Sequence, residues 1–200
     1  DRILHTNDPK PAHPKARVGL PMALSFYEQM PFWHAFFNAL GFETVRSEES
    51  DRNVYYKGQH TIASDTICYP AKLTHGHIES LLEQKVDFIF YPCMSYNIDE
   101  GENDNHYNCP VVAYYPELLK ANNPKLNKQN FRLPYMDLNQ PKNVARVMQE
   151  TLADYGITRK QTKAATEAAF AAQKQYREWV IAEGQRVIAQ AREAGKPIIV

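Results

Sequence analysis

The chain has 200 residues, 44% of them hydrophobic, which is typical of one large globular domain or two small ones. Its 23 basic and 23 acidic residues leave no net charge, which argues against the basic surface of a nucleic-acid-binding protein. No window approaches the 18 apolar residues of a membrane span, and residues 1–17 lack the apolar core of a signal peptide. We therefore expect a cytoplasmic protein whose partners are neither nucleic acid nor a membrane.

The first part of the chain alternates between short apolar runs and helical patterns. Four runs predict strands, at 16–21, 42–46, 86–91 and 109–115. Helical spacing predicts helices at 23–40, where Pro31 predicts a kink or a restart, and at 71–84, with a short helix or loop at 50–58. The run at 86–91 is almost continuously apolar, which indicates a strand buried on both faces of a parallel sheet.

The second part of the chain is predicted to be mostly helical. Pro141 predicts the first turn of one amphipathic helix, and Thr158 predicts the N-cap of a long helix at 159–194. The ending at 197–200 has the pattern of a buried strand, which suggests a piece of a longer polypeptide.

These patterns predict an α/β fold. We expect a flavodoxin-like or Rossmann-like, partly parallel sheet with helices on both faces, followed by a helical C-terminal segment. The predicted organisation is a disordered or extended segment at 1–15, an α/β domain at 16–140, and a helical segment at 141–200 that leads into a further domain.

Three cysteines are the strongest candidates for a functional site. Cys93 follows the predicted central strand, Cys68 precedes a predicted helix, and Cys109 starts a predicted strand after a polar loop at 97–108. Ligands of open α/β sheets bind at the carboxyl ends of strands, so Cys68 and Cys93 are expected at one rim. Cys109 reaches this rim only if the loop folds back. Three converging thiolates would bind an iron–sulfur cluster or a soft metal and leave one position open.

Two other interpretations of the cysteines remain open. Free cysteines are often small buried hydrophobic residues, and the spacing here contains no C-x-x-C pair. A mixed zinc site with His75 or His77 is the other alternative. Phosphate-binding glycine motifs are absent from the sequence, so we expect no ATPase site within these 200 residues.

Several strings resemble a known family. They are VGLPMAL at 18–24, PFW at 31–33, LGF at 40–42, SDTICYPAKL at 64–73, HGH at 75–77, DFIFYPC at 87–93 and NCPVV at 108–112. Together they resemble a domain of the acyl-CoA dehydratase activase-related proteins, the activators of (R)-2-hydroxyglutaryl-CoA dehydratase. The resemblance spans roughly residues 17–116. At a greater distance the domain is similar to the subunits of 2-hydroxyacyl-CoA dehydratases and double-cubane-cluster reductases.

The resemblance implies a function in ATP-driven electron transfer at low potential. It implies that Cys68, Cys93 and Cys109 bind a 4Fe–4S or related iron–sulfur cluster, with zinc as the alternative. Tyr69, His75, Tyr91 and Tyr96 would then line the approach for substrate. The implied partners are an ATPase activator domain of the same polypeptide, a dehydratase-like domain or subunit, and acyl-CoA. Whether the chain is itself an enzyme stays open, and the alternative function is a non-catalytic domain that docks these partners.

Overall fold

The structure is a computed structural model that describes residues 11–99, 101 and 104–199. Residues 1–10 of the predicted N-terminal segment lie outside this range. Four strands are present, β1 (Arg17–Leu20), β2 (Glu43–Arg46), β3 (Phe88–Phe90) and β4 (Phe131–Arg132). The α-helices are α1 (Phe26–Ala39), α2 (Arg52–Gly58), α3 (Tyr69–Glu83), α4 (Pro110–Asn122), α5 (Pro141–Thr151) and α6 (Arg159–Glu193). Short 3₁₀ turns are η1 (Gln59–Thr61) and η2 (Ala153–Tyr155).

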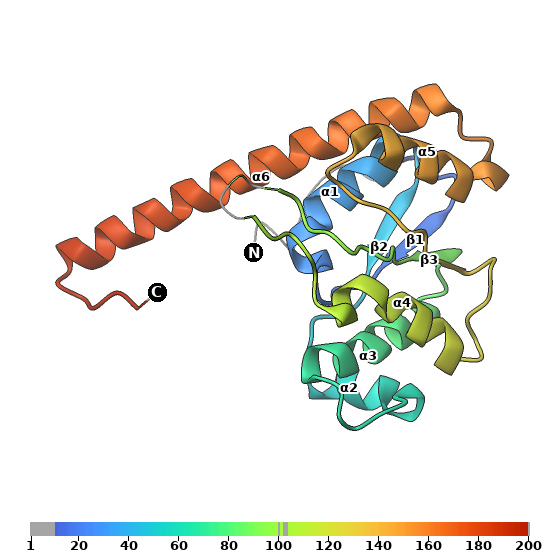
Figure 1. The fold of residues 1–200 in the computed structure, drawn as a ribbon, viewed down its shortest axis with the longest axis horizontal. Helices are drawn as coiled ribbons and strands as arrows, with labels where there is room; N and C mark the ends of the chain where they lie inside the picture. Colours follow the sequence, from blue (N-terminus) through green and yellow to red (C-terminus); the bar gives the residue numbers. More distant parts are fainter. Residues whose placement is uncertain (1–10, 100, 102–103, 200) are drawn as a thin grey trace.

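The strands form one parallel sheet in the order β2-β1-β3-β4. This is the order of a flavodoxin-like doubly wound fold. Helices α1, α5 and α6 cover one side of the sheet, and α2, α3 and α4 lie on the other (Figure 1). The predicted fold class is therefore confirmed.

The prediction of a strand at 109–115 is wrong, because this segment begins helix α4. Its Pro110 occupies the first turn of the helix, where the missing N–H breaks no hydrogen bond. The fourth strand is instead β4, which the sequence analysis did not identify. Ile89 and Tyr91 donate their backbone N–H groups to the carbonyl groups of Asn130 and Arg132, and these bonds align β4 beside β3.

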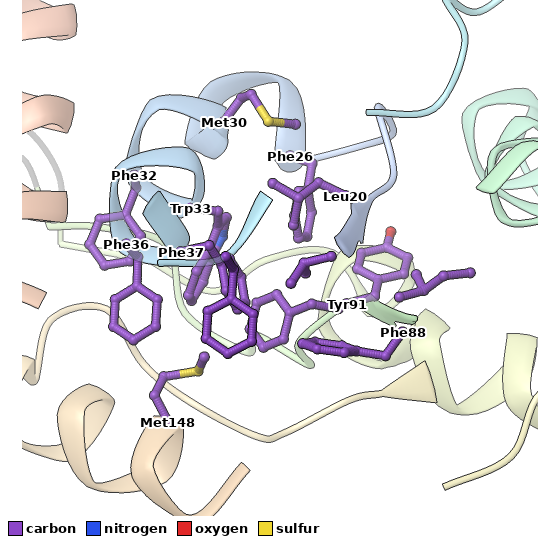
Figure 2. Packing of buried hydrophobic residues seen from close by; sticks show 14 of the residues in the cluster. Leu20, Phe26, Met30, Phe32, Trp33, Phe36, Phe37, Phe88, Tyr91 and Met148 are labelled. Carbon is purple, nitrogen blue, oxygen red and sulfur yellow. The ribbon is translucent and has the colours of Figure 1, made fainter. Parts of the chain in front are cut away.

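Aromatic side chains dominate the core between the sheet and α1 (Figure 2). Trp33 packs against Phe90 of the central strand, with ring centroids 4.7 Å apart, and Phe26 meets the Tyr91 ring edge-on at 5.3 Å. Pro31 lies inside α1, and the helix continues through it from Phe26 to Ala39. These contacts place the residues that follow β3 against the start of α1.

On the other side of the sheet, α2 and α3 approach each other through two glycines. A Cβ atom added at Gly76 of α3 would overlap with the backbone carbonyl of Val54 in α2. One added at Gly58 would overlap with the backbone around His75 and Gly76. The two helices can therefore lie this close only because both positions lack a side chain.

The long helix α6 is buried only in its first half. Thr158 caps it as predicted, and its hydroxyl accepts the N–H of Gln161 in a capping box. The buried positions lie in the first turns, which pack on α1, and the second half extends away from the body (Figure 1). Residues 197–199 form no strand, and Ile199 is 95% exposed, so the predicted buried strand is not present there; Val200 lies outside the described residues.

Within the part of the chain that the structure describes, no helix has both the length and the apolar character needed to cross a membrane.

Candidate functional site

Cys93 lies at the carboxyl edge of the sheet, three residues after β3, and is only 1% exposed. Its N–H donates to the carbonyl of Pro134 at 2.9 Å, and its carbonyl accepts from Met136 at 3.1 Å. These bonds continue the pairing of β3 with β4 and bring Tyr135 opposite Cys93. The backbone of Cys93 is therefore fixed on both sides.

Cys68 and Cys109 occupy equivalent positions at the starts of two helices. Cys68 is the N-cap of α3 and Cys109 is the N-cap of α4; both have extended backbones and exposed side chains. In the described chain neither side chain makes a capping hydrogen bond. The positive end of each helix dipole is therefore directed toward a thiol that has no capping role.

The loop that precedes Cys109 folds back on the sheet edge, which was the condition for Cys109 to approach Cys93. Asn97 donates its N–H to the carbonyl of His106 at 2.8 Å, and Asn108 donates its N–H to the carbonyl of Ser95 at 2.9 Å. The side-chain amide of Asn108 also donates to the carbonyl of Met94 at 2.9 Å. The residue before Cys109 is thus bonded to the residue after Cys93.

Two tyrosines lie close to the three thiols. Tyr91 is near enough to Cys93, Cys109 and Tyr115 for negative charge on them to raise its pKa, and negative charge on Cys68 raises the pKa of Tyr115 in the same way. Burial is the main cause that raises the pKa of Tyr91, and it raises the pKa of Tyr115 to about 12. Both hydroxyls are therefore protonated at neutral pH, and that of Tyr115 donates to Nε2 of His75.

The hydroxyl of Tyr91 is buried, and the side chain of Thr74 beside it lowers the pKa of Tyr91 through a hydrogen bond. The hydroxyl of Thr74 donates to the carbonyl of Pro70, so its oxygen remains able to accept from Tyr91.

The thiol of Cys93 differs from the other two because it is buried. Burial raises its pKa to about 11, and the nearby carboxylate of Glu117 adds to this rise. Glu117 in turn accepts a hydrogen bond from the hydroxyl of Tyr135 at 3.1 Å. Cys93 is therefore a neutral thiol at pH 7 unless an electrophile or metal displaces its proton.

His75, predicted to line the substrate approach, is buried in a hydrogen-bond chain that ends at Tyr115. The Thr61 hydroxyl donates to the carbonyl of Gly58, so it accepts from Nδ1–H of His75 at 2.7 Å. Nε2 of His75 then accepts from the Tyr115 hydroxyl at 2.9 Å. Burial, and secondarily His60, lowers the pKa of His75 to about 4, which keeps the ring neutral.

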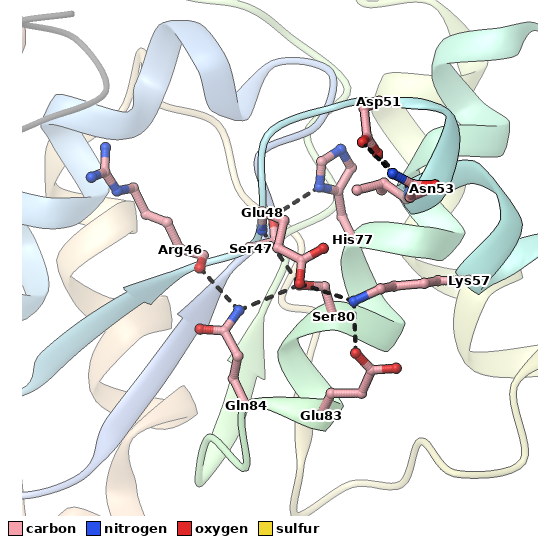
Figure 3. A network of polar contacts seen from close by, with 11 residues as sticks. Arg46, Ser47, Glu48, Asp51, Asn53, Lys57, His77, Ser80, Glu83 and Gln84 are labelled. Carbon is pink, nitrogen blue, oxygen red and sulfur yellow. Dashed lines mark hydrogen bonds and ion pairs between the residues drawn. The ribbon is translucent and has the colours of Figure 1, made fainter.

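His77 belongs to a separate network at the carboxyl end of β2 (Figure 3). Its Nδ1 lies 2.9 Å from the hydroxyl of Ser47, and its Nε2 lies 2.9 Å from the hydroxyl of Ser50. Burial lowers its pKa to about 4. Both ring nitrogens of His75 and of His77 are hydrogen-bonded, so neither ring has a free nitrogen for a metal.

The remaining predicted approach residues take different positions. Tyr91 is buried, as described above. Tyr69 is exposed and packs against Tyr55 of α2, with ring centroids 5.7 Å apart. Tyr96 is exposed and pairs with Tyr107 across the folded loop, with their hydroxyl oxygens 2.6 Å apart. No three His, Cys, Asp or Glu side chains in the described chain form a group that could hold a metal ion.

The sequence analysis missed Tyr115 and Tyr135, which lie close to the thiols of Cys68 and Cys93, respectively. Tyr115 was placed in a strand, but the apolar spacing of Val111, Tyr115 and Leu119 is helical and would have put it on the buried face of α4. Tyr135 follows a two-residue strand and carries no local signal of its own.

A comparison with protein families finds one matching model. The family is described as the CoA enzyme activase uncharacterised domain, and its model matches residues 17–200. No curated protein and no solved structure matches the chain.

Proposed function

Since this chain belongs to the CoA enzyme activase domain family, we propose that Cys68, Cys93 and Cys109 bind an iron–sulfur cluster used for low-potential electron transfer. The observation that carries this proposal is the arrangement of the thiols at one sheet edge. One follows the central strand, two begin neighbouring helices, and Tyr91 and Tyr115 lie near them.

The chemistry of the donor set fits such a cluster better than it fits zinc. Thiolates are the usual ligands of iron–sulfur clusters, and the sulfur atoms of a cluster accept hydrogen bonds from the protein. The Tyr91 hydroxyl is a buried donor in the neighbourhood of Cys93 and Cys109. A zinc site would need a histidine as its fourth ligand, and both ring nitrogens of His75 and of His77 are already hydrogen-bonded.

When bound, an iron–sulfur cluster would supply one-electron chemistry at low potential. The residues of the chain would bind and orient it. The thiol of Cys93 must lose its proton to act as a ligand, so binding releases a proton from a group whose pKa is about 11. The N-termini of α3 and α4 stabilise negative charge next to Cys68 and Cys109.

The wider activity that we propose is electron transfer to, or radical dehydration of, a 2-hydroxyacyl-CoA. The ATP hydrolysis that drives it would come from an ATPase activator domain of the same polypeptide, because this sequence contains no phosphate-binding glycine motif. A dehydratase-like domain or subunit would receive the electron.

Iron and sulfide quantification after anaerobic reconstitution tests the proposal. Wild type is expected to retain several irons per chain, and Cys68→Ser and Cys109→Ser are expected to lose most of them. Both of these thiols are exposed, so neither exchange should disturb folding. Ser64→Ala, in the exposed loop before Cys68, is the matched control and should bind iron as wild type does. Wild type without iron, or cysteine variants with full iron content, would overturn the proposal.

The second half of α6 favours docking as a second function. Val180 and Val187, and likewise Ile181 and Ile188, are seven residues apart and exposed, so they form an apolar stripe on one helix face. If the domain docks the ATPase activator domain through this stripe, Ile188→Lys should weaken binding in calorimetry. A triple Cys→Ser variant should then bind the ATPase activator domain as wild type does. If the triple variant lost this binding while Ile188→Lys kept it, docking through α6 would be contradicted.

A further inference from the structure

Four exposed tyrosines lie on one surface beside the thiols, which we call the tyrosine face: Tyr96, Tyr107, Tyr114 and Tyr135. The rings of Tyr96 and Tyr107 pack together, with their centroids 4.4 Å apart. Tyr114 of α4 adjoins this pair, because its hydroxyl accepts a hydrogen bond from the hydroxyl of Ser95 at 3.3 Å. The surface therefore continues from the folded loop onto helix α4.

Helix α4 extends the tyrosine face to the sheet edge at Cys93. Glu117 and Leu118 follow Tyr114 after one helical turn, and Leu118 is 46% exposed. Glu117 accepts from the hydroxyl of Tyr135 at 3.1 Å, and Tyr135 lies opposite Cys93. The tyrosine face thus reaches the place where the buried thiol lies.

The tyrosine face has the composition of a protein-binding surface. Aromatic side chains, tyrosine among them, are enriched at protein interfaces and often contribute most of the binding energy. A tyrosine has two rotatable side-chain bonds, so it loses little conformational entropy when a partner covers it. The hydroxyls of all four tyrosines are hydrogen-bonded within this surface, which restricts the rings further.

The charge around the tyrosine face is negative. Residues 93–119 contain no Lys or Arg, and they contain the carboxylates Asp99, Glu100, Glu102, Asp104 and Glu117. Asp137 is also near, because its charge contributes to raising the pKa of Tyr96, after the hydrogen bond to Tyr107 and burial. In the described chain Glu117 and Asp137 accept hydrogen bonds from uncharged groups only, and Asp99 lies 3.5 Å from the imidazole of His106. The described residues therefore leave this charge without Lys or Arg partners.

We propose that the tyrosine face docks an arginine-containing, basic surface of a partner protein. Nucleic acid, an anionic membrane and a second copy of this face would each bring like charges together. Guanidinium groups stack on tyrosine rings and donate paired hydrogen bonds to carboxylates, so arginine suits both components of the face better than lysine does. The tyrosine face is separate from the apolar stripe of α6, and docking on it requires no cluster at the thiols. This proposal and the iron–sulfur proposal can therefore fail independently.

NMR titration of the ¹⁵N-labelled full chain with short peptides tests the proposal. The probe is acetyl-RLRLR-amide at low ionic strength, and acetyl-ELELE-amide is the charge-reversed comparison. The arginine peptide is expected to shift the amide signals of residues 95–97, 105–108 and 135–137 saturably, and the glutamate peptide is expected to leave them unchanged. The lysine analogue acetyl-KLKLK-amide should bind about threefold more weakly, because lysine lacks the planar group that stacks on tyrosine.

Two substitutions on the tyrosine face are compared with two outside it. Tyr107→Ala removes a 68% exposed ring and should weaken binding of the arginine peptide about threefold, and Asp104→Lys should weaken it at least as much. Tyr56→Ala, at a 56% exposed position on α2, and Glu193→Lys, at the exposed end of α6, are the matched controls and should bind as wild type does.

Several results would overturn the proposal. They are the absence of a saturable shift with acetyl-RLRLR-amide, equal affinities for the arginine peptide and either of the other two peptides, shifts confined to other parts of the chain, and equal affinities in the face variants and their controls. Shifts of the same amides with protein concentration alone would place a second copy on the face instead and would also overturn it.

Discussion

Replacement of Gly76 by alanine should separate α2 from α3. An alanine Cβ would lie 2.8 Å from Cγ1 of Val54 and 2.5 Å from its carbonyl carbon. Carbon atoms in van der Waals contact are about 3.5–4.0 Å apart, and the Val54 carbonyl oxygen lies closer still to the added Cβ, so α2 would have to move by more than about 1 Å. Backbone atoms cannot move aside as a flexible side chain can.

The expected loss of stability follows from two opposing terms. Overpacking of a close contact costs about 1–3 kcal/mol, and more where backbone is involved. Alanine is a better helix former than glycine by about 1 kcal/mol, which offsets part of the cost. We therefore expect Gly76→Ala to lower the free energy of unfolding by about 2 kcal/mol or more.

Gly184→Ala is the matched control on a helix. An added Cβ at Gly184 meets no atom of the described residues within 4 Å, so only the helix-forming advantage of alanine remains. Urea unfolding followed by circular dichroism should show a lower midpoint for Gly76→Ala and an unchanged or higher midpoint for Gly184→Ala. Equal midpoints for the two variants would refute the packing argument.

Two further predictions concern stability. Burial lowers the pKa of His77 to about 4, below the value of about 6.5 in an unfolded chain, so the unfolded state binds the extra proton as pH falls. The contribution of His77 to the free energy of unfolding should be complete above pH 6.5 and should be lost as the pH falls toward 4, by up to on the order of 3 kcal/mol. Urea unfolding midpoints should therefore be lower at pH 5 than at pH 7.5, and this difference should be smaller in His77→Gln. Thr158→Ala should lower the thermal stability of wild type by about 1 kcal/mol through loss of the capping box, whereas Thr158→Ser should retain it; equal melting temperatures for the two variants would argue against the cap.

The sequence predicted elements best where a pattern was long or had only one physical explanation. The apolar run at 86–91 predicted a central strand, and β3 indeed lies between β1 and β4. The segment at 109–115 was misassigned because Val111, Val112 and Tyr115 suit a strand locally, whereas the start at Pro110 and the burial of Leu119 are explained by a helix. Short apolar runs do not distinguish the two.

Other features depend on tertiary contacts that no local pattern records. The strand β4 has two residues and exists because Asn130 and Arg132 accept hydrogen bonds from the residues of β3 and its extension. Sequence placed each cysteine at the end of an element, but the position of the loop before Cys109 depends on the bond from Asn108 to Met94. The burial of Tyr91 likewise follows from α1 packing over it.

The uncapped starts of α3 and α4 have a consequence for local motion. The first backbone N–H groups of a helix have no partner within it, and here the N-cap side chains of Cys68 and Cys109 do not supply one in the described chain. The first turns of both helices should therefore open more readily than the rest, and their amide hydrogens should exchange quickly. A ligand bound by the two thiols would hold both first turns closed. The fraction of protein with ligand bound at the sheet edge and the protection of these amide hydrogens from exchange would therefore increase together.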